Sequence, residues 1–130
     1  ALIENATGGS GADVIHGNGA DNRIFGGAGA DTIDGGAGGS NNLRGEDGND
    51  SLTGGAGFDD INGNMGDDTC ASGGGDDWVV GGRDNDSLTG SAGNNNLSGG
   101  GGNDGGREIE RTATTVVVPG SSTAPCSWGR

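Results

Sequence analysis

Residues 8–34 read GGSGADVIH, GNGADNRIF and GGAGADTID, three consecutive units of nine residues that share one pattern. The pattern continues through GGAGGSNNLR, which carries one extra residue, and then through GEDGNDSLT, GGAGFDDIN, GNMGDDTCA, SGGGDDWVV, GGRDNDSLT, GSAGNNNLS and GGGGNDGGR. Eleven units therefore cover residues 8–107, with a lead-in segment at 1–7 and a different segment at 108–130. A fixed short period of this kind indicates a solenoid built from stacked units.

Each position of the unit, numbered one to nine from Gly8, has a recurring residue type. Positions one to four are mostly glycine, which tolerates positive φ and lets neighbouring backbones approach closely. Position eight is apolar in ten units, and positions seven and nine are mainly polar. The position-eight residues are Ile15, Ile24, Ile33, Leu43, Leu52, Ile61, Cys70, Val79, Leu88 and Leu97. Polar–apolar–polar alternation predicts a three-residue strand with one side chain pointing inward.

A six-residue turn followed by a three-residue strand, repeated, predicts an all-β fold, a flattened parallel β-roll. Two units make one coil, so each turn stacks on the turn two units later along the same edge of the roll. We name these the odd-unit edge and the even-unit edge, after the units whose turns form them. Neighbouring turns on one edge are expected about 4.8 Å apart, the spacing of paired strands.

Position six is occupied by eight aspartates and three asparagines. The odd-unit edge stacks Asp13, Asp31, Asp50, Asp68, Asp86 and Asp104, and the even-unit edge stacks Asn22, Asn41, Asp59, Asp77 and Asn95. Carboxylate and carbonyl oxygens are the ligands that Ca²⁺ takes, six to eight at a time. We therefore expect several calcium ions between successive turns, bound by these aspartates. Turn carbonyls complete the predicted sites, for example those of Gly9, Gly11, Gly26, Gly27, Ala28, Gly29, Gly45, Asp47, Gly55, Gly57, Gly63 and Met65.

The two edges differ in charge. Every gap on the odd-unit edge lies between two aspartates, which gives five sites with both carboxylates. On the even-unit edge only the gap between Asp59 and Asp77 has two carboxylates, because asparagine supplies a neutral oxygen. The sequence therefore predicts an asymmetric roll with one strongly metallated edge.

Composition points to a cation as the partner. The net charge is −13, glycine accounts for 34 of 130 residues, and 28 % of residues are hydrophobic. An acidic chain does not suit nucleic acid, and no apolar run approaches the length of a membrane span. One inward apolar side chain per unit is too little to order so flexible a backbone, so we expect disorder without metal and folding upon calcium binding.

The unit resembles the RTX nonapeptide, G-G-x-G-x-D-x-U-x with U apolar, a calcium-binding repeat. The opening IENATGGSGADVIHGNGADN is also similar to the start of the C-terminal β-roll of serralysin-type secreted metalloproteases. The resemblance implies calcium held between aspartate carboxylates and turn carbonyls. It also implies an extracellular bacterial protein, exported by type I secretion and covalently linked to a catalytic or adhesive domain.

No catalytic constellation is expected in this chain, because His16 is the only histidine and no HExxH motif is present. Adjacent carboxylates such as Asp59 and Asp60 should point to opposite sides of a strand. One alternative is the non-catalytic C-terminal part of a secreted metalloprotease or other hydrolase. Another is a structural adhesin or ice-binding solenoid, which would need an outward ladder of threonine. Cys70 is expected to pack as a small apolar residue, and Trp78 to face outward.

The pattern fails at both ends. In the eleventh unit Gly105 and Gly106 stand where a strand should lie. Beyond it, residues 114–118 (TTVVV) predict a strand that caps the open end of the roll, and residues 119–125 a flexible tail. The last residues do not look like a type I secretion signal. Residues 1–7 are expected to form a strand or a link, and the start at Ala1 suggests a piece of a longer protein or a processed product.

Overall fold

The computed structural model describes residues 3–108 and 115–117, and every regular element within them is a β-strand. The strands are β1 (Ile3–Thr7), β2 (Val14–His16), β3 (Asp21–Ala28), β4 (Thr32–Asp34), β5 (Asn42–Asp47), β6 (Ser51–Ala56), β7 (Asp60–Met65), β8 (Thr69–Gly74), β9 (Trp78–Arg83), β10 (Ser87–Gly90), β11 (Asn96–Gly100), β12 (Gly105–Glu108) and β13 (Thr115–Val117). No helix in the described part of the chain is long and apolar enough to cross a membrane.

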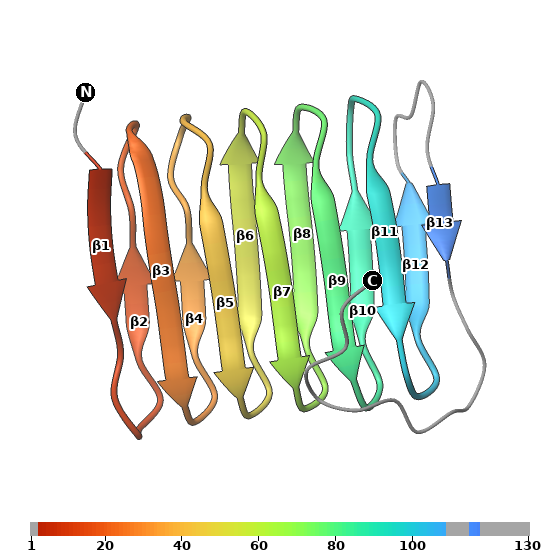
Figure 1. Cartoon of the computed structure of the whole chain (residues 1–130), viewed down its shortest axis with the longest axis horizontal. Helices are drawn as coiled ribbons and strands as arrows, with labels where there is room; N and C mark the ends of the chain where they lie inside the picture. Colours follow the sequence, from red (N-terminus) through yellow and green to blue (C-terminus); the bar gives the residue numbers. More distant parts are fainter. Residues whose placement is uncertain (1–2, 109–114, 118–130) are drawn as a thin grey trace.

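The strands form two parallel sheets that face each other (Figure 1). One sheet holds the seven odd-numbered strands in the order β1-β3-β5-β7-β9-β11-β13, and the other holds the six even-numbered strands. The chain alternates between the sheets, so consecutive strands of one sheet come from successive coils. In the register, Ile24 lies opposite Leu43, and Leu43 lies opposite Ile61. The predicted all-β parallel roll, with two units in each coil, is confirmed.

Most strands are longer than the predicted three residues. β2 and β4 have three residues each, but β5 to β9 have six and β3 has eight. The prediction was wrong for these strands because positions one to three of the next unit continue the parallel pairing, as Gly27 does opposite Glu46. After β3 and after β5 to β9, the tight turn is therefore confined to positions four to six of the next unit.

Positive φ occurs mainly at positions two and four of the units. Gly27 and Gly29 have φ of 101° and 118°, and the glycines at equivalent positions in later units behave alike. Three such places hold other residues, namely Glu46, Asn64 and Asp84, with φ between 80° and 81°. Glycine is favoured at these positions because a Cβ in the left-handed region meets the neighbouring carbonyl.

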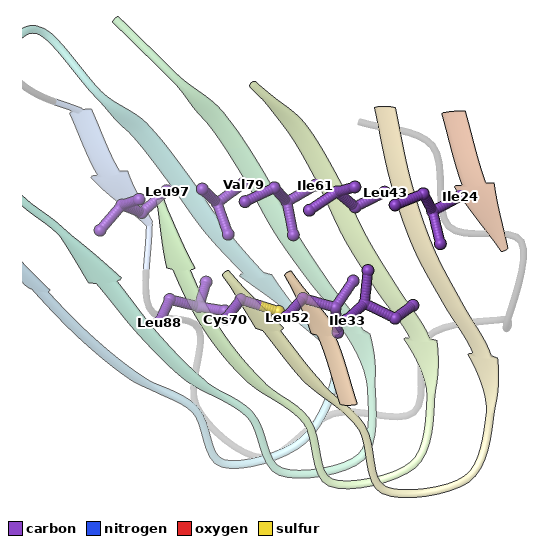
Figure 2. Close-up of a cluster of buried hydrophobic side chains, with 9 residues drawn as sticks. All are labelled: Ile24, Ile33, Leu43, Leu52, Ile61, Cys70, Val79, Leu88 and Leu97. Atoms are coloured by element: carbon purple, nitrogen blue, oxygen red, sulfur yellow. The ribbon is translucent and has the colours of Figure 1, made fainter. Parts of the chain in front are cut away.

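The core consists of the position-eight side chains, which form two rows between the sheets (Figure 2). One row, from the seven-stranded sheet, holds Ile24, Leu43, Ile61, Val79 and Leu97, and the other holds Ile33, Leu52, Cys70 and Leu88. Each of these side chains is at most 1 % exposed. Ala6 and Ile15 pack against this cluster while remaining partly exposed. The predicted inward position is confirmed, and the core is one side chain thick from each sheet.

Both ends of the roll add strands to the sheets. β1 lies in the lead-in segment and pairs with β3. β12 forms at Gly105–Glu108 and pairs with β10, although glycines occupy its first two positions, because the backbone pairing needs no side chain. β13 pairs with β11 and falls within the predicted capping strand. The other residues of that prediction, 114 and 118, lie outside the described residues, as does the predicted tail.

Candidate metal site in the turns

The position-six side chains from Asn22 to Asn95 are buried inside the turns, while Asp13 and Asp104 at the two ends are partly exposed. Asp31, Asp59 and Asp68 are at most 1 % exposed, and Asp50, Asp77 and Asp86 are 3 % exposed. On the odd-unit edge each backbone amide donates to the Oδ1 atom of the residue one coil later. The donor–acceptor pairs are Asp13–Asp31, Asp31–Asp50 and Asp50–Asp68 at 2.8 Å, and Asp68–Asp86 and Asp86–Asp104 at 2.9 Å. The carboxylates of this edge therefore form one continuous ladder.

The even-unit edge carries the same ladder with amides in place of some carboxylates. Its donor–acceptor pairs are Asn22–Asn41 at 3.0 Å, Asn41–Asp59 at 2.9 Å, and Asp59–Asp77 and Asp77–Asn95 at 3.0 Å. The interval is 18 residues except between Asn22 and Asn41, where the extra residue makes it 19. Both stacks of position-six residues that the sequence predicts are thus brought together.

The second carboxylate oxygen, Oδ2, is left without a partner. It is buried and accepts no hydrogen bond in Asp31, Asp50, Asp59, Asp68, Asp77, Asp86 and Asp104. Asp13, in the first turn, differs because its Oδ2 accepts from the Gly9 amide at 2.7 Å. Burying a charged oxygen without a partner costs several kcal/mol, on the order of the penalty for a desolvated ion. Each of these oxygens therefore requires either a proton or a cation.

The space that Oδ2 occupies exists because position one is glycine. The Asp68 Oδ2 and the Gly81 carbonyl oxygen both lie within 3.0 Å of the point where a Cβ on Gly63 would stand. Gly26, Gly45 and Gly54 face an equivalent pair of oxygens. None of these four glycines has positive φ, so glycine is needed here for room and not for backbone conformation. Two oxygens from different coils converge beside each of them.

Ser72 is the exception at position one among these turns. Its side chain is fully buried, and its hydroxyl donates to the Gly73 carbonyl at 3.4 Å. The hydroxyl also lies near the carboxylate of Asp77, where it partly offsets the rise in that residue's pKa. The turn of Asp77 is therefore more polar and more crowded than the others.

The turn of Asn22 shows which oxygens surround the end of a position-six side chain. Its Nδ2 donates to the carbonyls of Asn18 at 3.2 Å, Ala20 at 2.8 Å and Gly35 at 2.8 Å. It also donates to Asn41 Oδ1 at 2.9 Å. These acceptors come from positions two and four of its own unit and positions one and six of the next coil. We call this group of oxygens, with the position-six side chain, a turn cage.

Burial raises the pKa of six cage aspartates, namely Asp50, Asp59, Asp68, Asp77, Asp86 and Asp104. Desolvation is the largest cause, and nearby carboxylates add to it, whereas the backbone amide bonded to each Oδ1 lowers the pKa. The net result brings the pKa of Asp68 and Asp86 to about 8, and that of Asp50 and Asp77 to about 6. The pKa values of Asp59 and Asp104 are raised for the same principal reason. A cation in the cage would offset this penalty by favouring the ionised form.

The predicted carbonyl ligands fall into two groups. The first group lies at positions that supply cage carbonyls around Asn22. It comprises Gly26, Gly45 and Gly63 at position one, Gly9, Gly27 and Gly55 at position two, and Gly11, Gly29 and Gly57 at position four. Ala28, Asp47 and Met65 are at position three. Of these, the Asp47 carbonyl accepts from the Gly29 amide and the Met65 carbonyl from the Gly48 amide, both at 2.9 Å. Sequence reasoning did not name the carbonyls of Asn18, Ala20, Gly35, Gly54, Ser72 and Gly81, although their repeat positions would have identified them.

Within the described residues no group of three or more His, Cys, Asp or Glu side chains is placed to hold a metal ion. A cation in a turn cage would therefore depend on backbone carbonyls for most of its ligands. That requirement suits calcium, which accepts neutral carbonyl oxygens and high coordination numbers. It does not suit zinc, whose sites in proteins use thiolate, imidazole and carboxylate side chains.

A second ladder, which the sequence did not reveal, runs along the outside of the odd-unit edge at position five. The amides of Asp67, Asn85 and Asn103 donate to Oδ1 of Asn49, Asp67 and Asn85 at 2.9, 3.0 and 2.9 Å. Its bonds run from a later coil to an earlier one, opposite in direction to the inner ladder. All four side chains are exposed. Position five thus ties the coils together without using the cages.

Four other side chains, those of His16, Arg44, Cys70 and Trp78, lie apart from the cages. His16 is outward and exposed, 3.6 Å from the Asp34 carboxylate. Arg44 donates to the Asp60 carboxylate at 3.2 Å on the outer face of the seven-stranded sheet. Cys70 is a free, fully buried thiol that packs in the core, as predicted. Trp78 faces outward and is 40 % exposed, also as predicted.

Comparison with known families identifies the repeat. A family model described as RTX calcium-binding nonapeptide repeat (4 copies) matches residues 7–39, 36–70 and 72–105, which is more than half of the chain. No curated protein and no solved structure matches the chain. The matched segments contain all the turns described above.

Proposed function

The chain belongs to the RTX calcium-binding nonapeptide repeat family, and from this premise we propose that calcium held in its turn cages drives the folding of a secreted module. Repeats of this family form calcium-binding modules and are typical of secreted bacterial proteins. The module carries no chemistry of its own in this proposal. It acts as a structural element whose order depends on calcium.

The buried Oδ2 atoms of the cage aspartates are the strongest support for the proposal. Each cage aspartate from Asp31 to Asp104 has a buried Oδ2 without a hydrogen bond. In the cages closed by Gly26, Gly45, Gly54 and Gly63, a carbonyl from the next coil lies beside it. Oxygens gathered in this way repel one another until a positive charge lies among them. A calcium ion would bond to oxygens of both coils and so join them, which makes binding energy part of folding energy.

We propose that occupancy follows the carboxylates. The odd-unit edge offers five gaps flanked by aspartates on both sides, from Asp13–Asp31 to Asp86–Asp104. The even-unit edge offers one, Asp59–Asp77. The proposed ligands are the aspartate carboxylates together with turn carbonyls at positions one, two and four. Calcium would then be concentrated along one edge of the roll.

Calcium dependence gives the module a role in export. Extracellular calcium sites typically bind at about 10⁻⁴–10⁻³ M, far above cytosolic calcium levels. The chain would stay unfolded inside the cell, where an unfolded chain is suited to type I secretion, and fold once outside. Folding would then stiffen the chain and stabilise a covalently linked catalytic or adhesive domain.

Circular dichroism and size-exclusion chromatography during a calcium titration test the proposal, with magnesium as the control cation. We expect β-structure and compactness to appear together as calcium rises, and to be lost in EGTA. Magnesium should not replace calcium, because it requires near-octahedral geometry and gives up its water reluctantly. A chain that keeps its full β-signal and compactness in EGTA would refute the proposal.

A further inference from the structure

We propose that the side-chain amides of Asn22 and Asn41 are built-in substitutes for a bound cation, so that the first two turns of the even-unit edge close without metal. The inference rests on the proposed function, because it concerns which turn cages calcium fills. It goes further by assigning these two cages a positively polarised group of their own. We call them amide-closed turns.

The first argument is the position of the Asn22 amide nitrogen. Nδ2 lies 2.7 Å from the point where a Cβ on Gly17 would stand, and the Gly35 carbonyl oxygen lies 2.5 Å from the same point. In the next turn of the other edge, Asp31 Oδ2 and the Gly45 carbonyl oxygen converge on Gly26 in the same way. Asparagine and aspartate therefore place their terminal atoms alike. The two residues differ because the asparagine Nδ2 carries hydrogens, whereas the aspartate Oδ2 carries negative charge.

The second argument is the number of oxygens that the amide meets. Asn22 Nδ2 has four oxygen acceptors between 2.8 and 3.2 Å, three from backbone carbonyls and one from Asn41 Oδ1. Its two N–H groups are shared among them, so the inward-facing oxygens of the cage meet positive hydrogens. A buried Asp31 Oδ2 finds no hydrogen-bond donor in the corresponding place. The oxygens of the cage are thus met by the amide nitrogen of Asn22 but by no donor from a carboxylate, although Asn22 Oδ1 is itself buried without a hydrogen-bond partner.

Asn41 closes the next turn with a different balance of contacts. Its Nδ2 donates to Asp59 Oδ1 at 2.9 Å, and more distantly to the carbonyls of Gly54 at 3.3 Å and Gly38 at 3.4 Å. Its turn belongs to the unit that carries the extra residue. The bond to a carboxylate is the stronger kind of hydrogen bond, so Asn41 ties its coil mainly to the following one.

Together the two amides connect three successive coils without a cation. Asn22 reaches the coil of Asn41, and Asn41 reaches the coil of Asp59. Calcium is then required only from Asp59 onward on this edge, whereas on the odd-unit edge it is required from the first turns. The exchange of one atom in a side chain decides whether a turn takes a metal ion.

Isosteric exchanges in both directions test the inference. In Asn22→Asp a carboxylate replaces the amide, and we expect the folded chain to bind one more calcium ion than the wild type. In Asp31→Asn an amide replaces the carboxylate on the opposite edge, and we expect the loss of at least one ion. Calcium bound per chain is measured by equilibrium dialysis at saturating calcium chloride, with circular dichroism confirming that each variant is folded.

The number of calcium ions bound per chain distinguishes a failure of the inference from a failure of the proposed function. A wild-type chain that binds calcium while Asn22→Asp gains no ion would overturn the inference and leave the proposed function intact. A wild-type chain that binds no calcium would overturn the proposed function. A second readout is the calcium concentration at the folding midpoint, which Asn22→Asp should raise relative to the wild type because it removes the amide. An equal or lower midpoint in that variant would also overturn the inference.

Discussion

Replacing Gly63 with alanine should remove one calcium ion by filling the space that the ion needs. A Cβ at this position would overlap the carboxylate of Asp68 and lie 2.7 Å from the Gly81 carbonyl oxygen. Because Gly63 does not have positive φ, alanine introduces no backbone strain of its own. The effect of Gly63→Ala therefore reports on the cage alone.

The expected magnitude has two parts. Overpacking a tight site costs about 1–3 kcal/mol in any solution condition. Losing an ion bound at about 10⁻⁴ M costs about a further 2.7 kcal/mol in 10 mM calcium, where the ligand is about a hundredfold above its dissociation constant. We therefore expect Gly63→Ala to lower the free energy of unfolding by about 4–6 kcal/mol in 10 mM calcium.

Gly74→Ala is the matched control. Gly74 lies at position three, its φ is not positive, and no atom lies within 4 Å of a Cβ placed on it. Its substitution should change stability by less than about 1 kcal/mol and leave the calcium count unchanged. Urea denaturation followed by circular dichroism, together with equilibrium dialysis, measures both quantities. Equal stability and equal calcium content in the two variants would show that the space beside Gly63 holds no ion.

Two further predictions follow from the buried carboxylates and from the core. The pKa values of Asp68 and Asp86 in the metal-free fold, about 8, lie above the unfolded value of about 3.9, so protons stabilise that fold. This contribution is fully present below about pH 4 and is lost progressively as pH rises to about 8, and the β-signal in EGTA should therefore be stronger at pH 5 than at pH 9. Leu52→Ala should lower the stability of the calcium-loaded chain by about 2–5 kcal/mol, whereas the exposed neighbour change Thr53→Ala should stay within about 0.5 kcal/mol. Urea denaturation in calcium compares these two variants, and similar losses would contradict a core built from the position-eight side chains.

The nine-residue period was enough to predict the architecture. It identifies which side chains point inward, and Ile24, Leu43 and Ile61 lie opposite one another as the period requires. It did not predict strand length, because pairing at positions one to three depends on the neighbouring coil and not on residue type. Gly27 is a typical turn residue in isolation, yet it lies within β3.

The candidate site was predicted at the level of residue type but not of atoms. The sequence shows that Asp68 belongs to a stack of carboxylates, but not that its Oδ1 is taken by the Asp50 amide while its Oδ2 is left over. It also shows asparagine at Asn22 without showing that its amide nitrogen finds four oxygens. These details depend on how one coil meets the next, which a residue pattern does not encode.

The interval between hydrogen-bonded partners has a mechanical consequence. Side chains at positions five and six bond to backbone amides 18 or 19 residues away, in the adjacent coil. A chain pulled from its two ends would therefore lengthen by one coil at a time, since detaching a terminal coil breaks bonds only to its neighbour. Each event would release about 60 Å of extended polypeptide, so the roll would lengthen under tension in steps of nearly equal size.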